Sequence, residues 1–195
     1  MKWSINRQPV NMELPWNTVV VTGVPGVGKT SLCKKVSDDL GYNYINYGDL
    51  MLSIAESKGL ASTDFQMFSL DMDVQHNIWK GAALKIKDMN RVLVDLHGVD
   101  QSSIGYIVSL PALIIEPDVI ILIESSKGNI LQRRSKDSKE RIIDTVKSLK
   151  EHMDILKVTM ASCSAIIGCN LIILKNDDFK ACLEDMKNIL GGKLF

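Results

Sequence analysis

The segment GVPGVGKT, residues 23–30, is the feature that most constrains how this chain can fold. It satisfies the spacing G-x-x-x-x-G-K-[ST], and it stands between the apolar run TVVVT and a segment with helical spacing. Glycine lets the backbone turn tightly and approach a ligand closely, so consecutive amide groups can point inward around a phosphate. The helix that follows adds the positive end of its dipole. The sequence therefore predicts a strand, a phosphate-binding loop and a helix in direct succession.

The loop predicts a site for ATP and Mg²⁺. Lys29 is expected to reach the β- and γ-phosphates, and the Thr30 hydroxyl is expected to bind the metal ion. Asp95 ends the apolar run RVLVD, where an acidic residue can hold magnesium directly or through water. A glycine-rich turn without a ligand is the alternative. The residues predicted to bind the nucleotide are Gly23, Val24, Pro25, Gly26, Val27, Gly28, Lys29, Thr30 and Ser31.

Short apolar runs that are rich in Val, Ile or Tyr alternate with segments of helical spacing. The runs are residues 18–22, 42–46, 91–95, 118–123 and 170–174. The helical segments carry the apolar sets Leu32, Val36, Leu40; Val74, Ile78, Ala82, Ile86; and Phe179, Leu183, Met186, Leu190. This alternation predicts an α/β protein of the P-loop NTPase type. Its three layers are a five-stranded parallel sheet flanked by helices, with sites at the carboxyl ends of the strands and a short lid.

Charge and cysteine usage exclude several classes of partner. Lys plus Arg and Asp plus Glu both total 23, so the overall field favours neither nucleic acid nor a membrane. No apolar stretch approaches the roughly 18 residues that would span a bilayer. The four cysteines show no C-x-x-C spacing, which is consistent with a reducing cytoplasm. Residues 1–17, with two tryptophans, are expected to form a strap across the surface rather than a mobile tail.

A long helix is predicted from about residue 138 to residue 167. Its apolar positions alternate steps of four and three, in a heptad-like stripe. We expect this stripe to pack on the core of its own chain, and an interface between subunits is the alternative. The stripe consists of Ile142, Val146, Leu149, Met153, Leu156, Met160, Cys163 and Ile167.

The positive charge of the chain collects between residues 127 and 141. Six basic residues stand there against only Asp137 and Glu140. Because this segment follows a predicted strand, it should lie over the phosphate-binding loop as a lid, where guanidinium groups can stabilise a transferring phosphoryl group. An exposed helix start with solvated charges is the alternative. The basic residues are Lys127, Arg133, Arg134, Lys136, Lys139 and Arg141.

His97 directly follows the predicted metal-binding strand end. It could orient an acceptor or its phosphate, and a hydrogen-bonded structural histidine is an equal alternative. The segment DLHG also fits the D-x-x-G of regulatory GTPases, but the chain has no N-K-x-D for guanine, so we interpret this fit as accidental. His152 falls inside the long predicted helix and is expected to be packed or solvated.

Together these segments resemble the archaeal family of adenylate kinases, over nearly the whole chain from Thr18 onward. VVVTGVPGVGKT resembles the family's first strand and phosphate loop, and ILIESS followed by ILQRR resembles its fourth strand and lid entrance. Three further stretches resemble the acceptor side: INYGDLM at 45–51, VDLH at 94–97 and GYIVSLP at 105–111. Several segments together are more specific than a phosphate loop alone.

The resemblance implies reversible phosphoryl transfer, from ATP to AMP to give two ADP, by a cytoplasmic homotrimer. It divides the chain into an N-terminal extension (1–17) and a P-loop kinase domain (18–195), with an acceptor-binding region at about 46–90 and a lid at about 127–141. Lys29, Arg134 and Arg141 would be catalytic. The residues that would bind AMP are Asn46, Tyr47, Gly48, Asp49, His97, Gly105, Tyr106 and Leu110.

The chain departs from the family pattern on the acceptor side. An arginine that clamps the AMP phosphate is replaced by Phe68, and a basic residue before the G-Y segment is replaced by Gln101. Phenylalanine cannot replace a bidentate guanidinium. Two alternative functions follow: an adenylate-kinase-like ATPase of ribosome assembly, and a kinase for another nucleoside monophosphate or small acceptor.

Overall fold

Five parallel strands form the central sheet, in the order β2-β3-β1-β6-β7. The computed structural model describes residues 15–102, 105–136 and 146–193. Each strand predicted from the sequence is present, with bounds that differ by at most one residue from the prediction. The strands are β1 (Thr18–Thr22), β2 (Asn43–Asn46), β3 (Val92–Asp95), β6 (Val119–Glu124) and β7 (Asn170–Lys175).

The central strands are apolar throughout because helices cover both faces of the sheet. All five residues of β1 are buried, and Val20 pairs with Val94 of β3 and Ile120 of β6. The chain passes from β1 to the far edge, returns to β3, and then crosses to the other side of β1. This reversal of direction places the end of β1 at the topological switch point, where ligands bind in such sheets.

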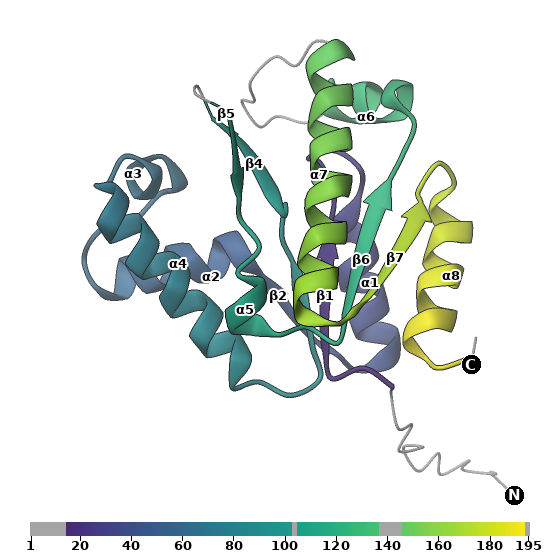
Figure 1. Ribbon diagram of the computed structural model, residues 1–195, viewed down its shortest axis with the longest axis horizontal. Helices are drawn as coiled ribbons and strands as arrows, with labels where there is room; N and C mark the ends of the chain where they lie inside the picture. The colour runs from purple at the N-terminus through teal and green to yellow at the C-terminus, as the bar shows by residue number, and fades with distance from the viewer. Residues whose placement is uncertain (1–14, 103–104, 137–145, 194–195) are drawn as a thin grey trace, which may run out of the picture.

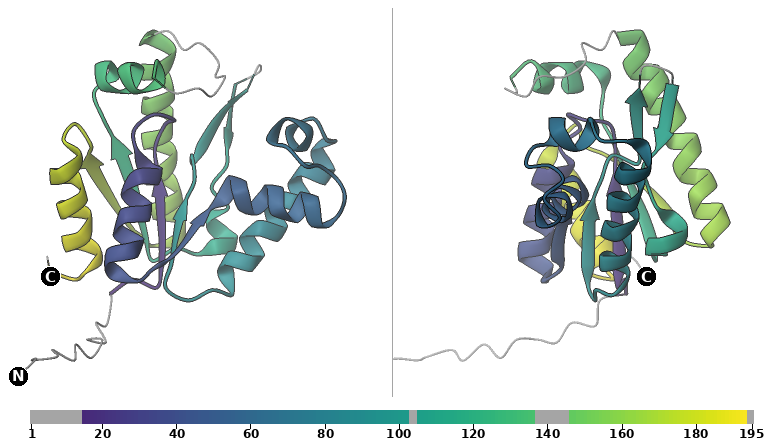
Figure 2. Two further views of the ribbon diagram at one scale, coloured as in Figure 1. Left: turned by 180° about the vertical axis from the view of Figure 1, so that it is seen from behind. Right: turned by 90° about the vertical axis from the view of Figure 1, so that its left-hand side faces the viewer.

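Two helices cover one face of the sheet, and one long helix covers the other (Figures 1 and 2). Helices α1 (Lys29–Leu40) and α8 (Phe179–Leu190) share the first face. Helix α1 buries Leu32, Cys33 and Val36, as its spacing predicts. Helix α8 begins its buried face at Cys182 instead, and Phe179 is 39% exposed.

Helix α7 (Val146–Ile167) lies on the opposite face, against β6 and β7. Leu149, Leu156 and Met160 of its apolar stripe are at most 2% exposed, so this part of the stripe packs on the core of its own chain. That prediction is confirmed for the part of the helix that the structure describes. The earlier predicted turns, with Ile142, lie outside the described residues.

An arm of three helices extends from the β2 edge of the sheet (Figure 1). It consists of α2 (Tyr47–Ser57), α3 (Asp64–Phe68) and α4 (Met72–Lys87). The buried Tyr47 hydroxyl donates to the carbonyl of Trp79 at 2.6 Å and ties α2 to α4. The indole of Trp79 donates in turn to the carbonyl of Ser109 at 3.3 Å. The first bond holds the arm together, and the second fixes it to the segment that follows the hairpin of β4 and β5.

A hairpin of two antiparallel strands stands beside α7 and is not predicted from the sequence. It pairs β4 (Val99–Ser102) with β5 (Gly105–Val108). Two short helices follow later in the chain, α5 (Ala112–Ile115) and α6 (Lys127–Arg134). The segment VDQSS has no alternation of apolar and polar residues that would indicate a strand. The buried His152 of α7 bonds the Val99 carbonyl at 2.9 Å, so tertiary packing stabilises the hairpin.

The last residues of the predicted N-terminal extension lie against the body of the protein. The indole of Trp16 donates to the Ile189 carbonyl at 3.3 Å, and the Tyr42 hydroxyl donates to the Trp16 carbonyl at 3.0 Å. Residues 1–14 lie outside the described part of the chain. Among the described helices, none combines the length and the apolar character that crossing a bilayer requires.

Gly98 provides a test of how tightly the ends of β1 and β3 are packed. Its φ is +87°, and a Cβ there would collide with the Thr22 hydroxyl. We expect Gly98→Ala to lower the free energy of unfolding by about 2 kcal/mol, because left-handed backbone strain adds to the collision. Denaturant unfolding measures this change.

The matched control is Gly128→Ala in α6, where a Cβ would meet open space. It should leave the free energy of unfolding unchanged or raise it by up to about 1 kcal/mol, since alanine is the better helix former. Equal stability of the two variants would contradict the packing described for Gly98.

Candidate active site

The phosphate-binding loop joins β1 to α1 and is covered from two sides by other parts of the chain. Gly26 and Gly28 have φ values of +89° and +96°, a region that glycine enters without strain. A Cβ at Gly26 would lie 2.9 Å from the Arg134 side chain, and one at Gly28 would lie 2.6 Å from the amide nitrogen of Asn176. These two glycines are therefore required both for the turn and for the close approach of neighbouring side chains.

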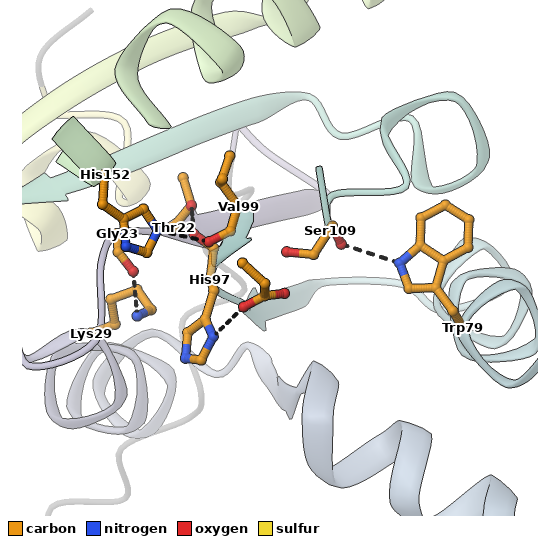
Figure 3. A network of polar contacts seen from close by, with 9 residues as sticks. Thr22, Gly23, Lys29, Trp79, His97, Val99, Ser109 and His152 are labelled. Carbon is orange, nitrogen blue, oxygen red and sulfur yellow. Dashed lines mark hydrogen bonds and ion pairs between the residues drawn. The ribbon is translucent and has the colours of Figure 1, made fainter. Parts of the chain in front are cut away.

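Lys29 lies at the first position of α1 and is 6% exposed. Its Nζ donates to the carbonyl of Gly23 at 2.7 Å, across the mouth of the loop (Figure 3). An ammonium group with this reach can move from the carbonyl to a bound phosphate oxygen by a small change in side-chain rotamer. The loop thus keeps its cation close to the position where phosphate charge would be bound.

Thr30, Asp95 and Tyr44 form a compact group of oxygen atoms next to the loop. The Thr30 hydroxyl donates to Asp95 Oδ2 at 2.6 Å, and the Tyr44 hydroxyl donates to the same oxygen at 3.2 Å. Asp95 is 3% exposed, so these two bonds stabilise a buried carboxylate. Burial and the charge of Asp95 raise the pKa of Tyr44, which therefore keeps its proton and donates. Hydroxyl and carboxylate oxygens are the ligands that Mg²⁺ prefers.

The last turn of α6 places two guanidinium groups on the carbonyls of the phosphate-binding loop. Arg134 Nε donates to the Pro25 carbonyl at 2.8 Å. Arg133 donates from Nη1 to the Val27 carbonyl at 3.0 Å and from Nη2 to the Asn176 carbonyl at 2.8 Å. The part of the basic segment that the structure describes therefore contacts the loop, while Lys127 and Lys136 are exposed. Arg141 lies outside the described residues.

The start of α2 lies beside the group formed by Thr30, Asp95 and Tyr44. Asn46 pairs in register with Asp95 across β2 and β3, and its side chain caps α2 by accepting from the Asp49 amide at 3.1 Å. Gly48 and Asp49 are exposed in the first turn, whereas Tyr47 is buried. Of the predicted AMP-binding residues, Asn46 thus ends the strand that adjoins Asp95, and Tyr47, Gly48 and Asp49 follow it.

The other residues predicted to bind the acceptor lie on the hairpin and after it. The Tyr106 ring is 5.5 Å from the ring of His152, centroid to centroid, and Gly105 begins the same strand. Leu110 is 4% exposed and belongs to the hydrophobic core. Its contribution to a pocket would therefore be to support the wall rather than to present a surface.

His97 is hydrogen-bonded and is also half exposed at the centre of the site. Its Nδ1 lies 2.8 Å from Asp100 Oδ1, and in Figure 3 the ring stands between Lys29 and Trp79. Its backbone carbonyl accepts the Thr22 hydroxyl at 2.6 Å. Burial acts to raise the pKa of Asp100, but the hydrogen bond and the charge of His97, together with smaller contributions from Ser109 and His152, lower the pKa overall.

The residues that depart from the family pattern have no packing role that would explain them. Phe68, the last residue of α3, is 63% exposed, and Phe65 on the same helix is 83% exposed. Gln101 pairs with Tyr106 in the hairpin. The tip of the arm therefore presents apolar rings where a guanidinium is expected.

Two residues of the site are not predicted by the sequence analysis. Tyr44 bonds Asp95, and Asn176 donates from Nδ2 to the Val27 carbonyl at 2.7 Å. Asn176 lies two residues after the predicted strand at 170–174, and the rule that sites lie at the carboxyl ends of parallel strands could have identified it. Tyr44 lies within a strand and carries no such signal.

Comparisons with known proteins agree with this geometry. A family model described as an AAA domain matches residues 22–150. An adenylate kinase homolog of Methanothermobacter thermautotrophicus is 46% identical over 89% of this chain and 92% of its own length. An adenylate kinase of Methanococcus vannielii is 36% identical over 82% and 90%. Shikimate kinase from Acinetobacter baumannii, solved in complex with shikimate, shares the fold with a TM-score of 0.61 at 12% identity, over 93% of this chain and 97% of its own.

The sheet order, the loop between β1 and α1 and the family model define a P-loop nucleotide-binding protein of the AAA-domain class. Within that class, the chain belongs to the adenylate kinase family that these archaeal relatives represent.

The pair of His97 and Asp100 predicts a dependence of stability on pH. Because the pKa of Asp100 is lowered in the folded protein, its stabilising contribution is present above the unfolded pKa of about 3.9 and is lost as the pH falls through the lowered value. Asp100→Asn should therefore destabilise the protein most at pH 6, and the destabilisation should decrease as the pH falls from about 4 toward 3.

Thermal or denaturant unfolding of both proteins across this range measures the difference. Asp38→Asn, which changes an exposed carboxylate on α1, is the control and should give a small, flat difference. A destabilisation by Asp100→Asn that is constant from pH 3 to pH 6 would contradict the ionic contribution.

Proposed function

We propose that this protein is an adenylate kinase, which transfers the γ-phosphoryl group of ATP reversibly to AMP and gives two molecules of ADP. The observation that supports this most directly is the register of β2 and β3, which sets the acceptor-side residue Asn46 beside Asp95 and Thr30. The proposed donor loop and the proposed acceptor region thus lie at the same end of the sheet, where the parallel strands have their carboxyl ends. The names of the archaeal relatives support the same reaction.

On the donor side, backbone N–H groups of residues 23–31, where Pro25 alone carries none, would cradle the phosphates of ATP. Lys29 would exchange the Gly23 carbonyl for the β- and γ-phosphates, and Arg134 would exchange the Pro25 carbonyl for the transferring group. Such an exchange keeps each cation hydrogen-bonded both without nucleotide and with nucleotide bound. By the family resemblance, Arg141 would join Arg134 in the lid.

The residues next to the loop fit a magnesium ion. Thr30 Oγ1 and the Asp95 carboxylate are hard oxygen donors within hydrogen-bond distance of each other, and their location beside Lys29 suits a metal that bridges phosphates. When bound, the ion would neutralise charge that develops between the β- and γ-phosphates.

On the acceptor side, AMP would lie between the start of α2 and the hairpin. Asn46, Tyr47, Gly48, Asp49, Gly105 and Tyr106 would form its pocket, supported by Leu110. The imidazole of His97, held by Asp100, would face the AMP phosphate. A general base is not required, because the acceptor oxygen is already ionised at neutral pH, and transfer depends on positioning and electrostatic stabilisation.

The family resemblance also motivates a cytoplasmic location and a homotrimeric assembly. The outer face of α7 carries the exposed side chains of Val158 and Ile166, which a subunit interface could cover. Light scattering coupled to gel filtration measures the assembly.

A coupled assay with each of the four common nucleoside monophosphates tests the reaction. We expect ADP formation to be fastest with AMP and to require Mg²⁺. Lys29→Ala should lower turnover by about 100-fold or more, because it removes a charge that stabilises the transition state, and circular dichroism should show an intact fold. A folded wild-type sample that binds ATP but forms no ADP with any of the four acceptors would overturn the proposal.

Phe68 provides a test of the acceptor half. Phe68→Arg places a guanidinium where the family pattern has one, at a side chain exposed enough to change without loss of packing. We expect the KM for AMP to fall by about tenfold, with little change in the KM for ATP, because a charge-assisted hydrogen bond forms to the AMP phosphate.

Phe65→Arg is the matched control, since it adds the same charge to α3 three residues earlier. An equal decrease in the KM for AMP in both variants would indicate a general electrostatic effect. No decrease in either variant would contradict the placement of the AMP phosphate near Phe68.

A further inference from the structure

The carbonyl of Val27, in the middle of the phosphate-binding loop, is held from outside by two donors. Asn176 Nδ2 donates to it at 2.7 Å, and Arg133 Nη1 donates to it at 3.0 Å. Asn176 follows β7, and Arg133 lies at the end of α6. Two distant parts of the chain therefore converge on one peptide group of the loop.

Asn176 is itself fixed on several sides. It is 1% exposed, and its backbone amide donates to the Glu124 carbonyl at 2.7 Å. Its own carbonyl accepts from the Ser125 hydroxyl at 3.0 Å and from Arg133 Nη2 at 2.8 Å. Arg133 thus bridges the carbonyl groups of Val27 and Asn176. This arrangement leaves the Asn176 side chain little freedom to move away from the loop.

The anchored carbonyl determines where the next amide points. A trans peptide group is planar, so the C=O of Val27 and the N–H of Gly28 point in opposite directions. Because the C=O points toward Asn176 and Arg133, the N–H of Gly28 points to the other side, away from the segment after β7. Gly28 is also the N-cap of α1, so this amide belongs to the helix end that attracts anions.

We propose that Asn176, together with Arg133, is a positioning residue of the donor site. It holds the peptide between Val27 and Gly28 in the orientation that binds the phosphate chain, and it acts through the loop rather than by contact with the nucleotide base. This inference rests on the donor site of the proposed function. It assigns a specific task to the loop that follows the last strand of the sheet.

The side chain cannot be replaced without loss of this anchor. Alanine removes the donor and leaves a space beside the loop. Aspartate keeps the shape of asparagine but presents an oxygen to the Val27 carbonyl in place of the amide nitrogen. Both changes remove the hydrogen bond from residue 176 to the Val27 carbonyl and so free the peptide group to rotate.

Binding of Mg-ATP and of inorganic tripolyphosphate tests the proposal, because tripolyphosphate has the phosphate chain but no base. Competition against a fluorescent ATP analogue gives both affinities for wild type, Asn176→Ala and the control Lys175→Gln. We expect Asn176→Ala to weaken both ligands by the same factor, about 10- to 100-fold. Lys175 is the exposed preceding residue, and its variant should bind both ligands as the wild type does.

Two results would overturn the inference. A loss of affinity for ATP without a loss for tripolyphosphate would mean that Asn176 acts on the base. Unchanged affinity for both ligands, with only a lower melting temperature, would mean that it supports the fold alone. Should Asn176→Ala fail to fold, Asn176→Asp keeps the side-chain volume and carries the same expectation and the same contrary outcomes.

A double-mutant cycle tests the shared carbonyl. Arg133→Ala and Asn176→Ala together should lose less tripolyphosphate affinity than the product of the two single losses, because both residues hold the same group. Strictly multiplicative losses would contradict joint action.

These experiments use no acceptor, so they distinguish the two proposals. A wild type that binds tripolyphosphate but does not phosphorylate AMP would leave this inference intact. A wild type that binds neither ATP nor tripolyphosphate would overturn the donor site itself.

Discussion

The buried carboxylate of Asp95 is the group on which the arrangement of this site depends. A carboxylate with 3% exposure is stable only if its oxygens are hydrogen-bonded, and its partners come from α1 and β2. The bonds from Thr30 and Tyr44 therefore join the helix after the phosphate-binding loop, the edge strand and the central strand β3 at one point. These bonds to Asp95 therefore set the positions of both the start of the arm and the end of the loop.

A second layer of contacts holds the loop from the opposite side. Arg133, Arg134 and Asn176 together donate to the carbonyls of Pro25 and Val27. When the loop carbonyls point outward to these side chains, the N–H groups of the same peptides point inward and can bind an anion. The contacts on the carbonyls therefore also orient the proposed phosphate site. Arg134 belongs to the segment proposed as a lid. Nucleotide binding would have to replace the hydrogen bond between Arg134 and the Pro25 carbonyl.

The acceptor side is built with fewer fixed contacts. Trp79, which accepts a hydrogen bond from Tyr47 within the arm, attaches the arm to Ser109, while the tip at α3 carries exposed phenylalanines. The chain belongs to the adenylate kinase family and has Phe68 where the family resemblance predicts an arginine. His97 is half exposed, and its Nδ1 lies 2.8 Å from Asp100 Oδ1. This asymmetry distinguishes the donor half from the acceptor half.

The sequence by itself determined the strands, the main helices and the loop from Gly23 to Thr30, because buried parallel strands and glycine turns leave local patterns. It also located Asp95 and the basic segment with Arg134. Only the tertiary structure decided that β4 and β5 form a hairpin, that His152 supports it, and that Asn176 and Tyr44 belong to the site. Their partners lie far away along the chain, and a hydrogen bond between distant segments leaves no periodicity in the sequence.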